Sequence, residues 1–250
     1  MGLRLFVHAV TLVFSHVGPA LRISALLYLV PAILYQVALA TLLTPNLNAL
    51  TSMSVASLIL GLIAAVAAFW IAVGWHRYIL LDETTETIVP PFRGDRILAY
   101  FGNSLLVGLI AFGIGLVVFI PLGIVAGVTA GGGGTPFFVL MLVPLIAYFI
   151  ITAICYRISL ILPASAIGKP ITLSQAWAAT SGANGTIFAL AFVSVVCVLL
   201  LTLPGLWIRS NLGVLPAFIW QTVVGWVELM VGISIITTLY GHYIEKRPVP

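Results

Sequence analysis

Six long apolar segments dominate this chain of 250 residues. They cover about 20–43, 53–81, 97–130, 136–167, 186–207 and 212–243. Each is longer than the roughly 20 residues that an α-helix needs to cross the hydrocarbon core of a bilayer. None shows the alternation of apolar and polar residues that membrane β-strands have. The segments therefore predict an all-α polytopic membrane protein, with six transmembrane helices in a single transmembrane domain that covers 1–250.

The composition supports the same class of protein. Hydrophobic residues make up 62% of the chain and charged residues only 6%, and the mean hydropathy is +1.24. A soluble domain carries roughly 25% charged residues. This difference excludes an ordinary soluble enzyme, a disordered regulator, a secreted disulfide scaffold and a nucleic-acid-binding protein. We therefore expect membrane lipids around the chain, and no nucleic acid as a partner.

Two shorter helices are predicted outside the six spans. Apolar residues recur at helical spacing over about 3–16, which predicts an amphipathic helix lying in the membrane interface and ending at Gly18-Pro19. Between the fourth and fifth spans, Thr172 and Gln175 have the spacing of a capping box. That spacing predicts a short interfacial helix over 173–180 on the cytoplasmic side. The first helix carries its apolar residues at Leu3, Phe6, Val7, Val10, Val13 and Phe14.

The basic residues predict how the chain is oriented. Only Arg209 falls between the fifth and sixth spans, whereas the other nine basic residues fall on the opposite side of the predicted membrane. Because basic residues concentrate on the cytoplasmic side, both termini are expected in the cytoplasm of a bacterial inner (cytoplasmic) membrane. The nine residues are Arg4, Arg22, Arg77, Arg93, Arg96, Arg157, Lys169, Lys246 and Arg247.

Glu228 is the only acidic residue within any of the predicted spans, and it lies near the middle of the sixth. A charge at that depth is costly, so an ionisable group there is a candidate functional site. Gln221, Gly225, Glu228 and Gly232 follow helical spacing and are expected to share one face that points into the bundle. Arg157 is the obvious cation to pair with Glu228, although it is expected nearer the cytoplasmic boundary than Glu228 is. A structural carboxyl, a proton or cation site and a ligand contact all remain open.

A second group of candidate residues lies on the predicted cytoplasmic side. Basic side chains and an interfacial tryptophan are typical contacts for lipid headgroups or for a protein partner. Near the end of the second span, Asp82, Glu83 and Glu86 are expected to form a solvated turn whose charge Arg93 and Arg96 offset. The candidate contacts are Arg157, Lys169, Trp177, Arg22 and Arg77.

The chain lacks the motifs of known catalytic and metal sites. There is no HExxH, no GxSxG and no pair of intramembrane aspartates. The four histidines lie near span ends or at the N-terminus without metal-ligand spacing. Cys155 and Cys197 are isolated within apolar runs. We therefore expect no catalytic residue, no metal and no cofactor.

Two stretches carry a resemblance to known families. The first comprises GWHRYILLDE at 74–83, then Pro90 and RILAYFGNSLL at 96–106, and it resembles six-span proteins of alphaproteobacteria. The second, YRISLILPASAIGKPITLSQAWAATSG at 156–182, is similar to the membrane domain that accompanies some glycerophosphodiester phosphodiesterases. The resemblance implies a membrane fold. It does not imply phosphodiesterase activity, because these residues contain no phosphodiesterase domain.

Three functional hypotheses follow. The first is a non-catalytic protein that serves as a scaffold or accessory subunit, or acts in lipid or envelope homeostasis, through its basic cytoplasmic face. The second is a small transporter or channel that uses Glu228. The third is an intramembrane enzyme, for which the sequence offers no motif. The sequence also leaves open whether the chain pairs with another membrane protein or with a second copy of itself.

Overall fold

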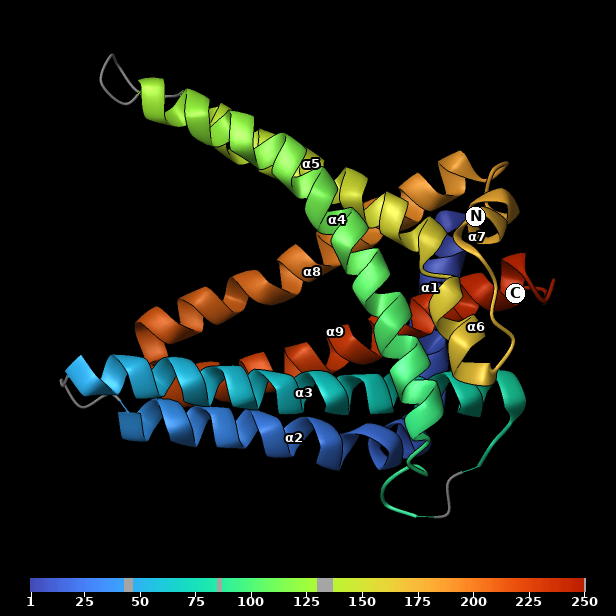
Figure 1. Cartoon of the computed structure of the whole chain (residues 1–250), viewed down its shortest axis with the longest axis horizontal. Coiled ribbons are helices and arrows are strands. Elements are labelled where there is room, and N and C mark those ends of the chain that lie inside the picture. Colours follow the sequence, from blue (N-terminus) through green and yellow to red (C-terminus); the bar gives the residue numbers. More distant parts are fainter. Residues whose placement is uncertain (43–46, 85–86, 130–136, 250) are drawn as a thin grey trace.

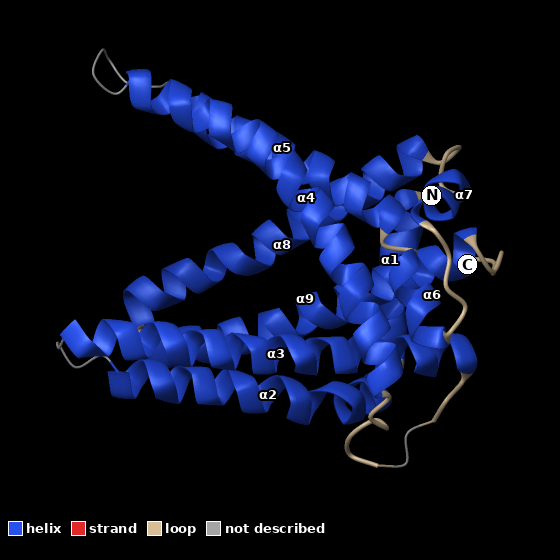
Figure 2. Ribbon diagram, in the orientation of Figure 1, coloured by secondary structure: helices blue, strands red, loops and turns tan. Residues whose placement is uncertain are grey.

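The computed structural model describes residues 1–42, 47–84, 87–129 and 137–249. The described residues form helices and contain no strand (Figure 2). The helices are α1 (Gly2–Ser15), α2 (Val17–Leu42), α3 (Leu47–Leu81), α4 (Gly94–Thr129), α5 (Phe137–Ile158), α6 (Ile161–Ile167), α7 (Leu173–Ala179), α8 (Asn184–Leu212) and α9 (Val214–Tyr243). The prediction of an all-α protein is confirmed.

Six candidate membrane spans occur within the described ranges, as the sequence predicts. They are Val17–Val37, Ser57–Leu81, Gly94–Thr129, Val139–Ile167, Asn184–Leu212 and Val214–Tyr243. The chain is therefore a multi-pass membrane protein. Its long helices pair as three hairpins, α2 with α3, α4 with α5, and α8 with α9 (Figure 1).

The three hairpins meet at one end of the molecule, and the α4–α5 hairpin diverges from the other two toward the opposite end (Figure 1). Both termini and the short helices α1, α6 and α7 lie at the end where they meet (Figure 1). The buried core is also there, and its largest side chains include Trp75 of α3, Ile161 of α6 and Tyr240 of α9. Away from this end the helices expose apolar side chains, for example Leu62 at 68% and Val117 at 75%. Such surfaces are suited to hydrocarbon rather than water.

The N-terminal helix packs closely against the bundle. α1 contacts α8 and α9, and it buries Leu5, Ala9 and Val13. Gly2 permits the closest approach, because a Cβ there would lie 2.5 Å from the Thr186 carbonyl oxygen. Of the apolar positions expected to share one face, Val13 is buried whereas Leu3, Val7 and Phe14 are more than half exposed. The predicted helix is present, and its apolar residues divide between an inner and an outer face.

The predicted fourth span, 136–167, consists of two helices. α5 ends at Ile158, and all seven residues of α6 are buried. Pro163 accounts for the break, because it has no N–H to donate to the carbonyl oxygen of Ser159, and its ring crowds that carbonyl. The Ser159 oxygen instead accepts from the N–H of Leu162, at 2.9 Å. α6 ends at Gly168, whose φ of +80° is a left-handed conformation that glycine adopts readily.

The predicted capping box is confirmed at the start of α7. The Thr172 hydroxyl accepts from the backbone N–H of Gln175 at 3.2 Å, and the Gln175 side chain accepts from the Thr172 N–H at 2.8 Å. Both bonds satisfy donors that a helix start leaves free. The helix lies between the fourth and fifth candidate spans, where the sequence places it.

Candidate functional site

An apolar groove of about 370 Å³ lies between α1, α8 and α9. α1 supplies the aromatic side chains of Phe6 and Phe14, and α9 supplies Glu228 and Gly232. Phe14 is 52% exposed and Leu200 of α8 is 64% exposed, so the groove opens on the outer surface of the molecule. Because α8 and α9 are candidate membrane spans, that surface is suited to lipid.

Glu228 lies at the middle of α9, as the sequence predicts, and it is partly buried in the groove wall. Its Oε1 is buried and has no hydrogen-bond partner among the residues that the structure describes. A buried polar atom without a partner is costly. The groove therefore holds one unsatisfied acceptor in an otherwise mainly apolar lining.

The predicted inward face of α9 is only partly formed. Gly232 lines the groove with Glu228. The hydroxyl of Tyr28 from α2 packs against Gly225, in the space that a side chain there would fill. Gln221 is exposed, although its side chain extends toward the neighbouring helix α8. Gln221 lies beside Gly205 of α8, which has no side chain to cover it.

Arg157 does not pair with Glu228. It is 8% exposed, donates to Oδ1 of Asn184, and lies with its guanidinium 4.8 Å from the ring centroid of Trp177. Within the described ranges no carboxylate pairs with it. The structure thus joins two predicted contact residues, Arg157 and Trp177, in one pocket between α5, α7 and α8.

The other predicted contacts fall into two groups. Arg77 is largely buried: its guanidinium binds both carboxylate oxygens of Glu83 and donates to the Ala166 carbonyl oxygen at 3.0 Å. Arg77 is therefore bound by partners within the protein and is not open to lipid headgroups. Lys169 and Arg22 are exposed and open to headgroups.

The predicted acidic turn is partly observed. Glu83 pairs with Arg77 and also with Arg93, at 3.2 Å. The hydrogen bond from Arg77, supported by the charges of both arginines, lowers the pKa of Glu83 even though burial opposes the shift. Arg96 pairs with Asp95 instead, at 3.1 Å. Glu86 lies outside the described residues.

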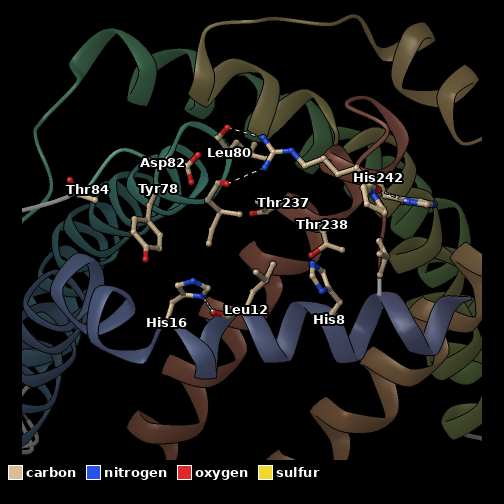
Figure 3. A pocket seen from close by; sticks show the side chains of 15 residues that line it. His8, Leu12, His16, Tyr78, Leu80, Asp82, Thr84, Thr237, Thr238 and His242 are labelled. Carbon is tan, nitrogen blue, oxygen red and sulfur yellow. Dashed lines mark hydrogen bonds between the residues drawn. The ribbon is translucent and has the colours of Figure 1, made fainter.

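A cavity of about 330 Å³ with several polar side chains in its lining, here called the end cavity, lies where the hairpins meet (Figure 3). It is lined by α1, the C-terminal part of α3, and the C-terminal part of α9 with the tail that follows. The polar side chains that line it include His8, His16, Tyr78, Asp82, Thr238 and His242. This cluster was not predicted from the sequence, because its members are far apart along the chain. The only local signal is the spacing of His8 and His16, which places both on one face of α1.

The contacts of His76 were also not predicted from the sequence. It is fully buried in the core. Its Nδ1 lies 2.8 Å from the Thr237 hydroxyl of α9, and its Nε2 lies 3.4 Å from the Tyr100 hydroxyl of α4. These contacts tie three candidate spans together, so His76 has a structural role.

Within the described part of the chain, no three His, Cys, Asp or Glu side chains lie close enough together to hold a metal ion. Comparison with known proteins found no match to a family model, to a curated protein or to a solved structure. The groove, the Arg157 pocket and the end cavity are therefore the candidate sites in the described part of the chain.

Proposed function

We propose that this chain is a non-catalytic, multi-pass protein of a bacterial inner membrane that binds a membrane lipid and acts in lipid or envelope homeostasis. The observation that carries the proposal is the groove between α1, α8 and α9. Its volume of about 370 Å³ falls within the roughly 300–1,000 Å³ of small-molecule sites in proteins.

The lining of the groove supports a lipid as its occupant. The groove lies beside two candidate membrane spans, so lipid chains are the molecules at highest concentration at its mouth. The side chains of Phe6, Phe14 and Leu200 offer apolar contact to an acyl or prenyl chain. Glu228 adds one polar group, which would favour a lipid that brings a hydrogen-bond donor deep into the membrane.

The distribution of basic residues supports the orientation that we propose, with both termini in the cytoplasm. The N-terminus, the C-terminus and α7 lie together at one end of the molecule (Figure 1). Arg209, by contrast, lies in the last turn of α8, near the tip of a hairpin. An excess of basic residues at one end is typical of the cytoplasmic side.

The experiment is purification in lipid nanodiscs followed by mass spectrometry of the retained lipids. The variant Gly232→Leu fills the groove, because an added Cβ at Gly232 meets no atom within 4 Å. The control is Gly108→Leu, an equally open glycine on the exposed surface of α4. We expect the wild type and the control to retain an enriched lipid that the groove variant loses. Equal lipid content in all three proteins would contradict the proposal.

The same preparation separates lipid binding from a role as a scaffold or accessory subunit. A protein retained at a fixed ratio to this chain, together with an unselective lipid content, would favour the accessory role.

A transporter or channel is the second candidate, and the unpartnered Oε1 of Glu228 is the observation that favours it. Glu228→Gln keeps the shape of the side chain and removes its charge. If the carboxyl carries protons or cations, this change abolishes flux in reconstituted vesicles while the protein stays folded. Retained flux in the variant would exclude this use of Glu228.

A further inference from the structure

The Arg157 pocket, of about 370 Å³, lies where α5 ends and α8 begins. Arg157 is in the last turn of α5, Asn184 is the first residue of α8, and Trp177 lies on α7, which connects the two in the chain. Because α5 and α8 belong to candidate membrane spans, these helix ends are expected at the level of lipid headgroups. The pocket and the groove share no lining residue, so the inference below does not rest on the proposed function.

The pocket contains a buried cation without a counterion. The Arg157 guanidinium donates to Oδ1 of Asn184, and its carbon lies 4.8 Å from the centroid of the Trp177 ring. Arg157 is only 8% exposed. A buried charge is costly unless an opposite charge compensates it. Among the described residues, no acidic side chain lines the pocket or pairs with Arg157.

The unpaired polar groups beside this cation are mainly N–H donors. A guanidinium has several N–H groups, and in the described chain Asn184 is the one hydrogen-bond partner of Arg157. None of its nitrogens is among the enclosed polar atoms that lack a partner, so its free N–H groups are accessible. Because Oδ1 of Asn184 accepts from Arg157, the amide nitrogen of Asn184 is left with further free donors. α8 also begins without a side-chain cap, so the partial positive charge of its first turn is not offset there.

We infer that the Arg157 pocket binds the phosphate group of a phospholipid whose headgroup carries no ammonium group. A phosphate has a negative charge and several acceptor oxygens, and the planar fork of an arginine binds such oxygens in pairs. Asn184 touches the guanidinium, so the donors of both side chains are within reach of one phosphate. The ammonium of an aminophospholipid or of a choline lipid would find no carboxylate in the lining, and it would place a second cation beside Arg157.

The apolar part of the lining favours a phospholipid over a soluble phosphate compound. Ile154 of α5 and Phe188 of α8 line the pocket beside Arg157. Phe188 is 44% exposed and Phe192, one helical turn further along α8, is 61% exposed. Both rings contact Phe149 of α5. These side chains form an apolar surface that leads from the pocket along two candidate spans, where an acyl chain of the same lipid can lie.

The test compares two sources of phosphate. The full chain is reconstituted in nanodiscs with equal amounts of phosphatidylglycerol and phosphatidylethanolamine, extracted in mild detergent, and analysed by mass spectrometry of the retained lipids. We expect phosphatidylglycerol to be enriched over its share in the disc. In parallel, inorganic phosphate is titrated into the chain in phosphatidylcholine nanodiscs and followed by calorimetry. Binding of inorganic phosphate without lipid enrichment would assign the pocket to a soluble phosphate compound and overturn the inference, as would the absence of both.

Asn184→Asp tests the pocket without removing its cation. The variant places a carboxylate of the same shape against Arg157, so an internal ion pair takes the place of the phosphate. A negative charge at the start of α8 is compatible with the helix. We therefore expect the enrichment of phosphatidylglycerol to be lost while the unfolding temperature is not lowered. Equal enrichment in Asn184→Asp and wild type would overturn the inference.

Gln175→Glu is the matched control, because it makes the same change from amide to carboxylate in the first turn of α7. Gln175 is exposed and outside the pocket lining, and glutamate can keep the capping box with Thr172. Enrichment should persist in this control. Its loss in the control as well would mean that the overall charge of the protein selects the lipid, and that would also overturn the inference.

Ser181→Glu provides a second carboxylate at the pocket. Ser181 is an exposed residue of the turn before α8 and lines the pocket, so this change alters neither α5 nor α8. It should also abolish the enrichment, and it decides the question if Asn184→Asp fails to fold. Gly232→Leu, which fills the groove, should leave the enrichment of phosphatidylglycerol intact. Failure of the groove proposal is therefore distinguishable from failure of this one.

Discussion

Arg157 is a buried guanidinium that is stabilised by neutral groups. One of its N–H groups donates to the amide oxygen of Asn184, and its guanidinium carbon lies over the ring of Trp177. A lysine ammonium carries the same charge, but it lacks the flat surface and the fork of donors that make both contacts at once. Charge alone therefore does not explain this position, and the shape of the cation matters.

We predict that Arg157→Lys destabilises the protein by about 1–3 kcal/mol, the cost of a buried charge that loses a good hydrogen bond and its aromatic partner. Thermal unfolding of the purified protein, followed by tryptophan fluorescence, measures the effect. Arg22→Lys is the control, because Arg22 is exposed and the change there should be near zero. Equal stability of Arg157→Lys and wild type would show that charge alone suffices.

Glu83 gives the protein a dependence on pH. Hydrogen bonds and charge from Arg77, with the charge of Arg93, lower its pKa below the ordinary value of 4.5. A carboxyl with a lowered folded-state pKa stabilises the fold above its unfolded pKa, and this stability is lost as the pH falls through the folded value. We predict a constant contribution above about pH 5 that declines on further acidification.

The measurement for Glu83 is the unfolding temperature between pH 7 and pH 3. Glu83→Gln should lower it at neutral pH and flatten the dependence below pH 5, because the titrating group is gone. A variant with the same acid dependence as wild type would assign that dependence to other groups. Glu83 is partly exposed, so solvent and salt reduce the size of the effect.

Whether a residue's environment could be predicted depends on how locally it is determined. The capping box of Thr172 and Gln175 was predictable, because both partners lie within one helical turn. Glu228 was predictable as a residue in the middle of a span, because run length sets depth. The pairing of Arg157 with Trp177 was not, although both were expected on the same side of the membrane. Nothing in the sequence orients the two side chains toward each other across a turn and a helix.

Among the helices, α1 depends most on a close approach. Gly2 lies against the backbone of α8, where a Cβ would meet the Thr186 oxygen at 2.5 Å and the Leu190 nitrogen at 2.7 Å. Backbone atoms cannot rotate away, so a larger residue must push α1 outward. The same displacement would deform both the groove and the end cavity, because α1 lines both.

We predict that Gly2→Ala destabilises the protein by about 1–3 kcal/mol through overpacking, and increases hydrogen exchange along α1. Gly102→Ala, in the exposed interior of α4, should be neutral or stabilising by up to about 1 kcal/mol. Thermal unfolding and amide exchange by mass spectrometry measure both variants. Unchanged exchange in α1 would mean that the helix does not need its close contact with α8.

The break between α5 and α6 shows where hydropathy stops being informative. Pro163 is a visible local signal for the end of a helix. The burial of all of α6 is not visible, because a buried apolar residue and a lipid-facing one have the same composition. Lipid removes the contrast between inside and outside that makes amphipathic patterns readable in soluble proteins. For this reason the single span predicted over 136–167 did not reveal that α6 is a separate helix buried in the core.

The similarity between buried and lipid-facing apolar residues also limits what can be predicted for the whole molecule. The number of spans was predictable, because six apolar runs and the loops between them are local features. The divergence of the α4–α5 hairpin from the other two was not, since it depends on which lipid-compatible surfaces pack together (Figure 1). It leaves long apolar surfaces on α3 and α4 that only lipid or another membrane protein can cover.

The orientation of the molecule yields the last prediction. In a background with Cys155→Ala and Cys197→Ala, Ser210→Cys places a thiol at the end of α8 and Ser181→Cys places one between α7 and α8. Both serines are exposed, so the two changes are matched. Because nine of the ten basic residues lie on the side of the termini, Ser210→Cys should react with an impermeant maleimide from outside the inner membrane.

Ser181→Cys should react only after that membrane is disrupted. The reverse pattern would invert the orientation, and the basic end of the molecule would then face away from the cytoplasm. Labelling of both thiols from one side would contradict the single crossing of α8 between them.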